Sequence, residues 1–133
     1  INYLPYPINY GFIPQTILSK NVGGDGDMLD VIVIGPRIKR GSIVKVNVIG
    51  MLEIIDEGKI DSKILSVLIR DGLKISEVNS LSDLKKDYAG ILEIISIWFE
   101  NYKGTKLKIK NIFGKKRSFE EIKLRHTDFL SEN

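Results

Sequence analysis

The sequence predicts an α+β fold that is mainly β, and three patterns support this prediction. Apolar and polar residues alternate over 42–55, as they do in a half-buried strand. Asp-Glu-Gly at 56–58 follows as a hairpin turn, and residues 60–69 form the return strand. Large apolar residues recur every three or four positions over 81–103, which indicates one amphipathic helix. Bent antiparallel strands with a helix packed outside indicate a small barrel of the OB type.

The N-terminal third combines irregular and strand-like sequence. Residues 1–16 hold three prolines, which exclude a helix, so we expect an extended, irregular stretch with a turn near 9–11. Glycines and an asparagine over 19–27 predict a loop. Residues 29–35 are almost wholly apolar and predict a short buried strand.

The remaining boundaries follow from glycines and capping residues. We expect the long strand to bend at Gly50, and the long helix to be capped by Ser82 and to end before Gly104. Alternation over 105–113 predicts another strand. Ser118, with a glutamate three residues later, forms a capping-box pattern at the start of a last helix.

Composition limits the kinds of chemistry that this chain can perform. Its 133 residues suit a single domain over 1–133, with 43% hydrophobic and 28% charged residues. The absence of cysteine excludes disulfides and thiolate-held metals, and a single histidine, His126, gives little support to a Ser–His hydrolase. A basic tract over 103–117 permits nucleic-acid binding, but a solvated strand and turn explain it more simply.

The two ends of the chain and its apolar runs bear on location. No apolar run is long enough to span a bilayer, so we expect a cytoplasmic protein with no membrane partner. The chain begins at Ile1 and enters aromatic sequence with no polar lead-in, so we expect a processed chain or a piece of a longer protein.

The sharpest motif is Gly-Asp-Gly-Asp-Met-Leu-Asp at 24–30, where a loop enters a buried strand. It places Asp25, Asp27 and Asp30 within six residues. Close carboxylates repel one another, and Mg²⁺, which takes oxygen ligands and keeps several waters, removes that cost. The alternative is a Gly-rich turn whose aspartates bond only local backbone. A calcium EF-hand is rejected because position twelve of its loop would be Pro36 instead of glutamate.

A second acidic group lies at the hairpin. Asp56 and Asp61 straddle the turn, and Lys63 lies two residues further on the same strand face as Asp61. Two carboxylates beside a lysine could hold metal and phosphate together, although an ordinary solvated hairpin has the same composition. Tyr102 and Lys103 end the predicted helix and could donate to phosphate oxygens, or Tyr102 could simply pack in the core.

Four segments together resemble the soluble family I inorganic pyrophosphatases. Tyr-Pro-Ile-Asn-Tyr-Gly-Phe-Ile-Pro at 6–14 is similar to the family's YPxNYGFIP stretch, and Asp-Gly-Asp-Met-Leu-Asp-Val at 25–31 to its D-G-D-P-x-D signature. Residues 49–63 resemble the segment with further acidic ligands, and Trp-Phe-Glu-Asn-Tyr-Lys at 98–103 resembles FFExYK. Order and spacing agree from about residue 3 to residue 110.

The resemblance implies a five-stranded OB-like barrel with flanking helices. It also implies Mg²⁺-dependent hydrolysis of pyrophosphate to two phosphates by a metal-activated water, with several Mg²⁺ ions, Mn²⁺ or Zn²⁺ as substitutes, and assembly as a hexamer or dimer. The implied roles are metal ligation by Asp25, Asp30, Asp56 and Asp61, proton removal by Asp27, and binding of phosphate oxygens by Tyr10, Lys63, Tyr102 and Lys103.

Two departures from the family pattern leave other readings open. Met28 replaces the proline of the signature, at a position that is not a ligand. The family's N-terminal region, which supplies a lysine, acidic residues and an arginine, has no counterpart before Ile1, so we expect an N-terminally truncated chain. The alternatives are a catalytically impaired pyrophosphatase-like protein and an OB-type module that binds nucleic acid.

Overall fold

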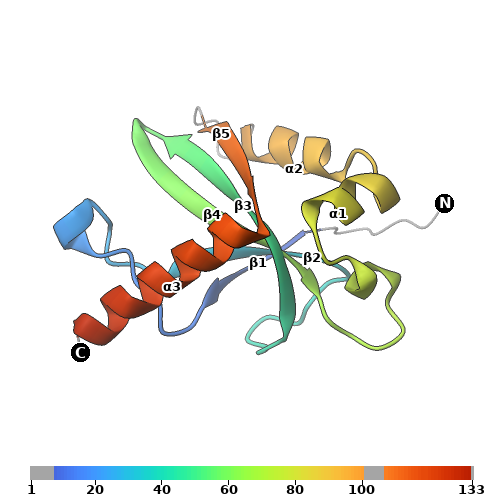
Figure 1. Cartoon of the computed structure of the whole chain (residues 1–133), viewed down its shortest axis with the longest axis horizontal. Coiled ribbons are helices and arrows are strands. Elements are labelled where there is room, and N and C mark those ends of the chain that lie inside the picture. The colour runs from blue at the N-terminus through green and yellow to red at the C-terminus, as the bar shows by residue number, and fades with distance from the viewer. Residues whose placement is uncertain (1–7, 101–106, 133) are drawn as a thin grey trace.

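Five strands form one mixed sheet in the computed structural model, which describes residues 8–100 and 107–132 (Figure 1). The strands are β1 (Ile8–Ile13), β2 (Leu29–Ile34), β3 (Val46–Asp56), β4 (Lys59–Leu68) and β5 (Leu107–Gly114), in the spatial order β1-β2-β4-β3-β5. The β2–β4 pair is parallel and the other pairs are antiparallel. The α+β prediction is confirmed. Within the described ranges β1 and β5 stay unpaired edges, so the sheet is open and "barrel" describes it only loosely.

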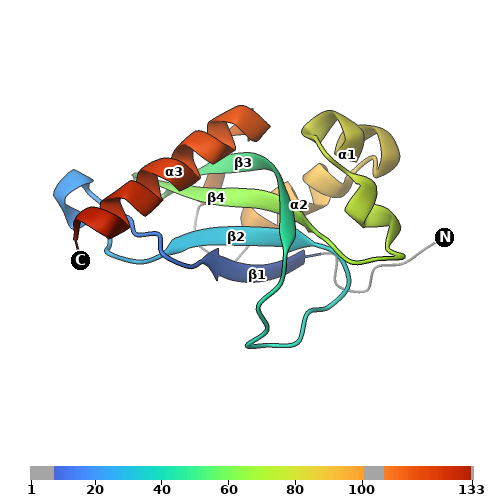
Figure 2. The same cartoon turned by 60° about the horizontal axis from the view of Figure 1, so that its bottom comes forward.

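Helices cover both faces of the sheet (Figures 1 and 2). On one side lie α1 (Leu81–Asp87) and α2 (Ile91–Glu100), and on the other lies α3 (Lys115–Ser131). Two short 3₁₀ helices, η1 (Lys20–Val22) and η2 (Lys74–Glu77), lie in the connections. Among the described residues, no helix is both long and apolar enough to cross a membrane.

The two sheet faces produce two apolar cores because side chains alternate along each strand. The first core, between the sheet and α1–α2, includes Ile32, Ile34, Leu52, Ile54, Leu65, Val67, Leu84, Ile95 and Phe99. The second core, on the α3 side, includes Leu29, Val31, Val33, Met51, Ile64 and Leu68, with Phe113 and Ile122 packed against it. Burial on both faces explains why residues 29–34 are almost wholly apolar, with Asp30 as the exception.

The predicted bend in the long strand is present at Gly50. The pairing register between β3 and β4 shifts between Val48 and Gly50, which is a β-bulge. A Cβ atom at Gly50 would lie 2.7 Å from the carbonyl oxygen of Phe113. Glycine therefore lets β5 approach this point of β3 closely.

The predicted turn near 9–11 is wrong, because these residues continue the regular strand β1; the first seven residues of the predicted extended segment lie outside the described residues. Asn9 explains why a polar, turn-forming residue is tolerated there. Its amide donates to the carbonyl oxygens of Val33 (3.2 Å) and Pro36 (3.0 Å), and its Oδ1 accepts from the Ile38 backbone at 2.9 Å. The side chain thus ties β1 to the loop after β2.

The prediction of a single helix over 81–103 is also wrong in its middle, because the chain breaks between α1 and α2. Gly90 has φ +89°, a left-handed conformation that interrupts a helix. The cap is Ser80 instead of Ser82, since the Ser80 hydroxyl accepts from the Asp83 backbone at 3.0 Å. Gly104, the predicted stop, lies outside the described residues.

The last helix begins earlier than its capping-box pattern indicates. Helix α3 begins at Lys115 with Gly114 as its N-cap residue. Ser118 lies inside the helix, and its hydroxyl donates to the Gly114 carbonyl at 2.8 Å. Ser118 therefore does not cap the helix. Its hydroxyl bonds to the backbone of the preceding turn, which is the other common hydrogen bond of a serine near a helix start.

Candidate metal and phosphate site

One face of the sheet gathers most of the predicted site residues. In the strand register Asp30 lies opposite Lys63, and Asp61 lies opposite Ile54, which belongs to the first core. Directly paired residues share a face, and so do residues two apart on one strand. Asp30, Lys63, Asp61 and Asp56 therefore all lie on the face covered by α1 and α2, where the apolar core ends and polar residues begin.

Lys63 is shared by two carboxylates. Its Nζ forms an ion pair with Asp30 Oδ2, and a second with Asp61 Oδ2 at 2.7 Å. The lysine side chain is 12% exposed, whereas Asp30 and Asp61 are 40% and 31% exposed. The ammonium thus lies below the two carboxylates, which keep one side open to solvent.

The charges of this group are not balanced. Burial alone would lower the pKa of Lys63, but hydrogen bonds to Asp30 and Asp61 outweigh burial and raise that pKa. Burial raises the pKa of Asp61; the hydrogen bond from Lys63 opposes this rise, and the carboxylates of Asp30 and Asp25 add to it. The two directions are compatible because one ammonium serves two carboxylates while Asp25 adds further negative charge. Additional positive charge would relieve the excess.

The glycine-rich loop holds Asp25 and Asp27 at the surface. The Asp27 backbone N–H donates to Asp25 Oδ1 at 2.9 Å, so one carboxylate oxygen supports the local turn. The loop is closed at its base: Leu18 donates to the Asp27 carbonyl, and Gly26 donates to the Leu18 carbonyl, both at 2.8 Å. Both aspartates are exposed. One oxygen of Asp25 therefore bonds to local backbone, as the Gly-rich turn alternative predicts. The second oxygen of Asp25 and both oxygens of Asp27 can still reach a metal ion or water.

We expect Gly24→Ala to open this loop. A Cβ atom at Gly24 would lie 2.3 Å from the carbonyl oxygen of Leu18, which is backbone and cannot yield. The variant should lose about 1–3 kcal/mol of stability and bind divalent metal more weakly. Urea unfolding and calorimetric metal titration measure both effects. Gly11→Ala is the control, because its Cβ would only reach ordinary contact with Val31 at 3.8 Å; equal behaviour of the two variants would contradict the expectation.

The raised pKa of Asp61 gives a pH dependence with a defined sign. The unfolded chain releases this proton near the ordinary value of 3.8, and the folded chain releases it at a higher pH. Between these values the folded chain binds more protons, so the free energy of unfolding falls as pH rises. Asp61→Asn is expected to remove this fall. Urea unfolding in chelator from about pH 4 to about pH 7 measures this pH dependence. The control is Asp71→Asn in an exposed turn, which should leave the fall in unfolding free energy with pH unchanged.

The phosphate-binding candidates are only partly described. Tyr10 shares the face of Ile32 and is 46% exposed, with its ring 5.8 Å from Trp98 and 5.7 Å from Phe99. These contacts seat the C-terminal end of α2 against β1. Tyr102 and Lys103 lie outside the described residues.

The described residues bring part of the predicted site together. Asp25, Asp30, Asp61 and Lys63 interact electrostatically, whereas Asp56 shares the sheet face but lies at the hairpin end opposite Lys59. Over 8–100 and 107–132, no three carboxylate or histidine side chains form a ready metal-binding group. The oxygen-only donor set and its excess negative charge fit a hard dication.

Sequence reasoning missed Thr16, which fixes the base of the acidic loop. This threonine is 2% exposed; its hydroxyl donates to the Ile13 carbonyl at 2.6 Å and accepts from the Leu29 backbone at 3.0 Å. It joins the end of β1 to the start of β2. A threonine two residues after a proline carries no signal for this role, because its partners are backbone groups whose positions are set by the sheet.

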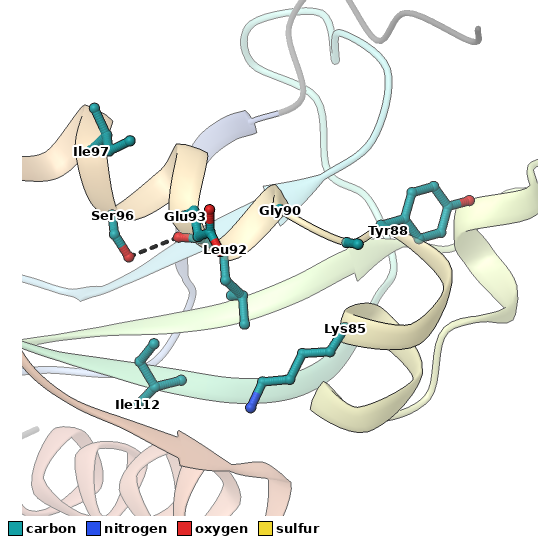
Figure 3. Close-up of a pocket in the computed structure, with 9 residues that line it drawn as sticks. Lys85, Tyr88, Gly90, Leu92, Glu93, Ser96, Ile97 and Ile112 are labelled. Atoms are coloured by element: carbon teal, nitrogen blue, oxygen red, sulfur yellow. Dashed lines mark hydrogen bonds between the residues drawn. The ribbon is translucent and has the colours of Figure 1, made fainter.

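A groove of about 670 Å³ lies elsewhere, between α1–α2 and β5 (Figure 3). Its lining is mostly apolar and consists of Lys85, Tyr88, Ala89, Gly90, Leu92, Glu93, Ser96, Ile97 and Ile112. The Ser96 hydroxyl is occupied within α2, where it donates to the Leu92 carbonyl at 2.7 Å. None of the predicted site residues within 8–100 and 107–132 lines the groove, so the groove is separate from the acidic residues described above.

Comparison with known proteins decides the family. Residues 1–129 match the model of the Pyrophosphatase family, described as inorganic pyrophosphatase. This chain belongs to the inorganic pyrophosphatase family. It is 39% identical over 117 residues to an inorganic pyrophosphatase of Encephalitozoon cuniculi, which covers 82% of this chain and 42% of that protein. It is also 40% identical to an inorganic pyrophosphatase of Drosophila melanogaster, and that match covers 82% of this chain and 34% of the Drosophila protein.

Solved pyrophosphatase structures share the fold. The inorganic pyrophosphatase of Helicobacter pylori superposes with a TM-score of 0.80 at 30% identity, over 94% of this chain and 72% of that one. The N-terminally truncated vacuolar soluble pyrophosphatase of Trypanosoma cruzi, in complex with PPi, superposes with a TM-score of 0.83 at 29% identity. The match covers 93% of this chain and 52% of that one. The chain spans less than half the length of the curated relatives named above. Family membership implies a divalent metal cofactor.

Proposed function

We propose that this inorganic pyrophosphatase family member hydrolyses pyrophosphate to two phosphates with Mg²⁺. The observation that carries the proposal is the pair of carboxylates, Asp30 and Asp61, that share the single Lys63 ammonium at the end of the first core, with the charge of Asp25 acting on Asp61. Such a group has too little positive charge of its own and offers only oxygen donors, which suits Mg²⁺. The PPi complex of the similar T. cruzi protein supports pyrophosphate as the ligand.

Each proposed role follows from the chemistry of the side chain. Asp25, Asp30, Asp56 and Asp61 supply carboxylate oxygens to Mg²⁺, with Mn²⁺ or Zn²⁺ as substitutes. When bound, the metal neutralises phosphate charge and lowers the pKa of the attacking water. Asp27, which is exposed beside these ligands, accepts the proton of that water. Tyr10, Lys63, Tyr102 and Lys103 bind phosphate oxygens as donors.

Lys63 has two tasks in this proposal. Without metal, its ammonium compensates Asp30 and Asp61, as the ion pairs indicate. If those carboxylates held Mg²⁺, the Lys63 ammonium would be free to donate to a phosphate oxygen. Lys63 would thus pair with carboxylates in the metal-free protein and with phosphate in the loaded one, so that negative charge at the site is balanced in both.

The direct test is phosphate release by the purified chain. We expect release from pyrophosphate that requires millimolar-scale Mg²⁺ and stops in chelator. ATP and a phosphate monoester are the control substrates and should be hydrolysed far more slowly. Metal-dependent thermal stabilisation without phosphate release would indicate an impaired family member and would overturn the proposed activity. Salt-sensitive oligonucleotide binding unaffected by Asp25→Asn would instead favour an OB-type nucleic-acid module.

Assembly, domain extent and location are part of the same proposal. We propose that residues 1–133 form one domain, that copies assemble as a hexamer or dimer, and that the protein acts in the cytoplasm. The family supports these statements only generally, since two similar plant and algal proteins are named chloroplastic. Sedimentation velocity measures the assembly, and a monomer at micromolar concentration would contradict that part.

A further inference from the structure

The C-terminal half of α3 holds the segment that leads into the acidic loop. Three links join them: His126 Nδ1 to the Gln15 carbonyl at 2.8 Å, the Ile17 backbone N–H to the Arg125 carbonyl at 3.2 Å, and the Ser19 hydroxyl to Glu132 Oε1 at 2.9 Å. The linked residues 15, 17 and 19 alternate, so one edge of this segment follows the helix. Figures 1 and 2 both show the η1 loop beside the C-terminal end of α3.

The His126 link supports a strained residue. Gln15 has φ +59°, a left-handed conformation that a residue with a Cβ adopts at a cost of about 1 kcal/mol. A carbonyl oxygen can only accept, so His126 donates through Nδ1. The bond fixes the Gln15 peptide in the orientation that turns the chain from β1 toward the loop. Such a conformation persists only where surrounding contacts determine it.

The Glu132 link organises the loop itself. The Ser19 hydroxyl donates to Glu132 and accepts from the Asn21 backbone at 3.2 Å, which caps η1. Ser19 is 6% exposed, and its carbonyl oxygen accepts from Gly24 at 2.8 Å, one residue before Asp25. Glu132 therefore orients Ser19, which bonds to the backbone of the acidic loop at two points.

The helix that provides these links is itself fixed. Ile122 packs against the second core, and Arg125 is 8% exposed. The Arg125 guanidinium forms an ion pair with Asp128 at 3.1 Å and approaches Glu121 at 3.7 Å. A rigid helix seated on the sheet can transmit its position to the loop, whereas a frayed one could not.

We propose that α3 with its C-cap residue Glu132 is a positioning element, which acts through His126 and Glu132 and sets the divalent-metal affinity of the Asp25–Asp27 loop. Neither residue lies among the predicted ligands, and both act through Gln15 and Ser19. The inference rests on the proposed function only in that the loop binds metal. Groups that orient ligands from outside typically change metal affinity 10- to 100-fold when removed.

The experiment compares Mg²⁺ binding in variants that remove or keep each link. His126→Ala and Glu132→Ala together are expected to weaken Mg²⁺ binding, measured by calorimetry with the metal alone, by about 10-fold. His126→Asn keeps a donor near the Nδ1 position and Glu132→Gln keeps an acceptor, so both should retain affinity within about twofold. Glu120→Ala, exposed on the same helix, is the matched control. Thermal unfolding in chelator establishes that each variant folds.

The outcomes separate this inference from the proposed activity. In the double variant the Mg²⁺ concentration for half-maximal phosphate release should rise about 10-fold while kcat at saturating metal stays nearly constant. Unchanged Mg²⁺ affinity with only a lower melting temperature would overturn the inference, as would an absence of Mg²⁺ binding in the unmodified chain. If that chain binds Mg²⁺ without releasing phosphate, the proposed activity fails, and the affinities still decide the inference.

Discussion

Asp27→Asn is expected to lower kcat for pyrophosphate about 10²- to 10⁴-fold, which is the range for loss of a positioned general base. Asparagine has nearly the same shape but cannot accept a proton from water. The folded state should change little, because the loop uses the backbone of Asp27: its N–H donates to Asp25, and its carbonyl accepts from Leu18. Steady-state phosphate release at saturating Mg²⁺, with urea unfolding beside it, measures both quantities.

The matched control for this prediction is Asp71→Asn. Asp71 is another exposed aspartate beside a glycine, far along the chain from the acidic loop. It should retain full turnover. Near-normal kcat in Asp27→Asn would remove Asp27 from the mechanism, whereas loss of stability of several kcal/mol would assign it a structural role.

Lys63→Met is expected to destabilise the metal-free protein by about 1–3 kcal/mol, because Asp30 and Asp61 lose their shared cation. The loss is smaller than for a fully buried pair, since both carboxylates reach solvent. Methionine fills most of the space of the lysine stem, so the packing is kept. Added Mg²⁺ should therefore raise the melting temperature of the variant more than that of the unmodified protein, because no ammonium competes for the carboxylates.

Two further measurements test the Lys63 prediction. Lys108→Met, an exposed lysine on β5 without a described ion pair, should alter neither the stability nor the response to Mg²⁺. Pyrophosphate hydrolysis by Lys63→Met should fall, because a phosphate donor is lost. Equal Mg²⁺ stabilisation of the variant and the unmodified chain would show that Lys63 and metal do not exchange on the same carboxylates.

Strand predictions succeeded where side-chain periodicity matched burial. The buried strand over 29–35, the hairpin turn at 56–58 and the bend at Gly50 were predicted from local sequence, and the structure has β2, the β3–β4 hairpin and a β-bulge at these places. The turn at 9–11 and the unbroken helix over 81–103 were not found. Asn9 belongs to a strand because its amide bonds to a distant loop, and the helix breaks because Gly90 adopts a left-handed conformation between two apolar stretches that look continuous.

For the candidate site, too, some features followed from the sequence and others only from the tertiary structure. The sequence alone indicated which residues could bind metal and phosphate, because aspartates between glycines and a lysine beside two aspartates are suitable donors, although a Gly-rich turn and a solvated hairpin have the same composition. Only the tertiary structure decided that Lys63 lies between Asp30 and Asp61, that Asp56 is set apart at the hairpin end, and that α3 supports the loop. Strand pairing and helix docking join residues 33 to 113 positions apart, and no local pattern records such contacts.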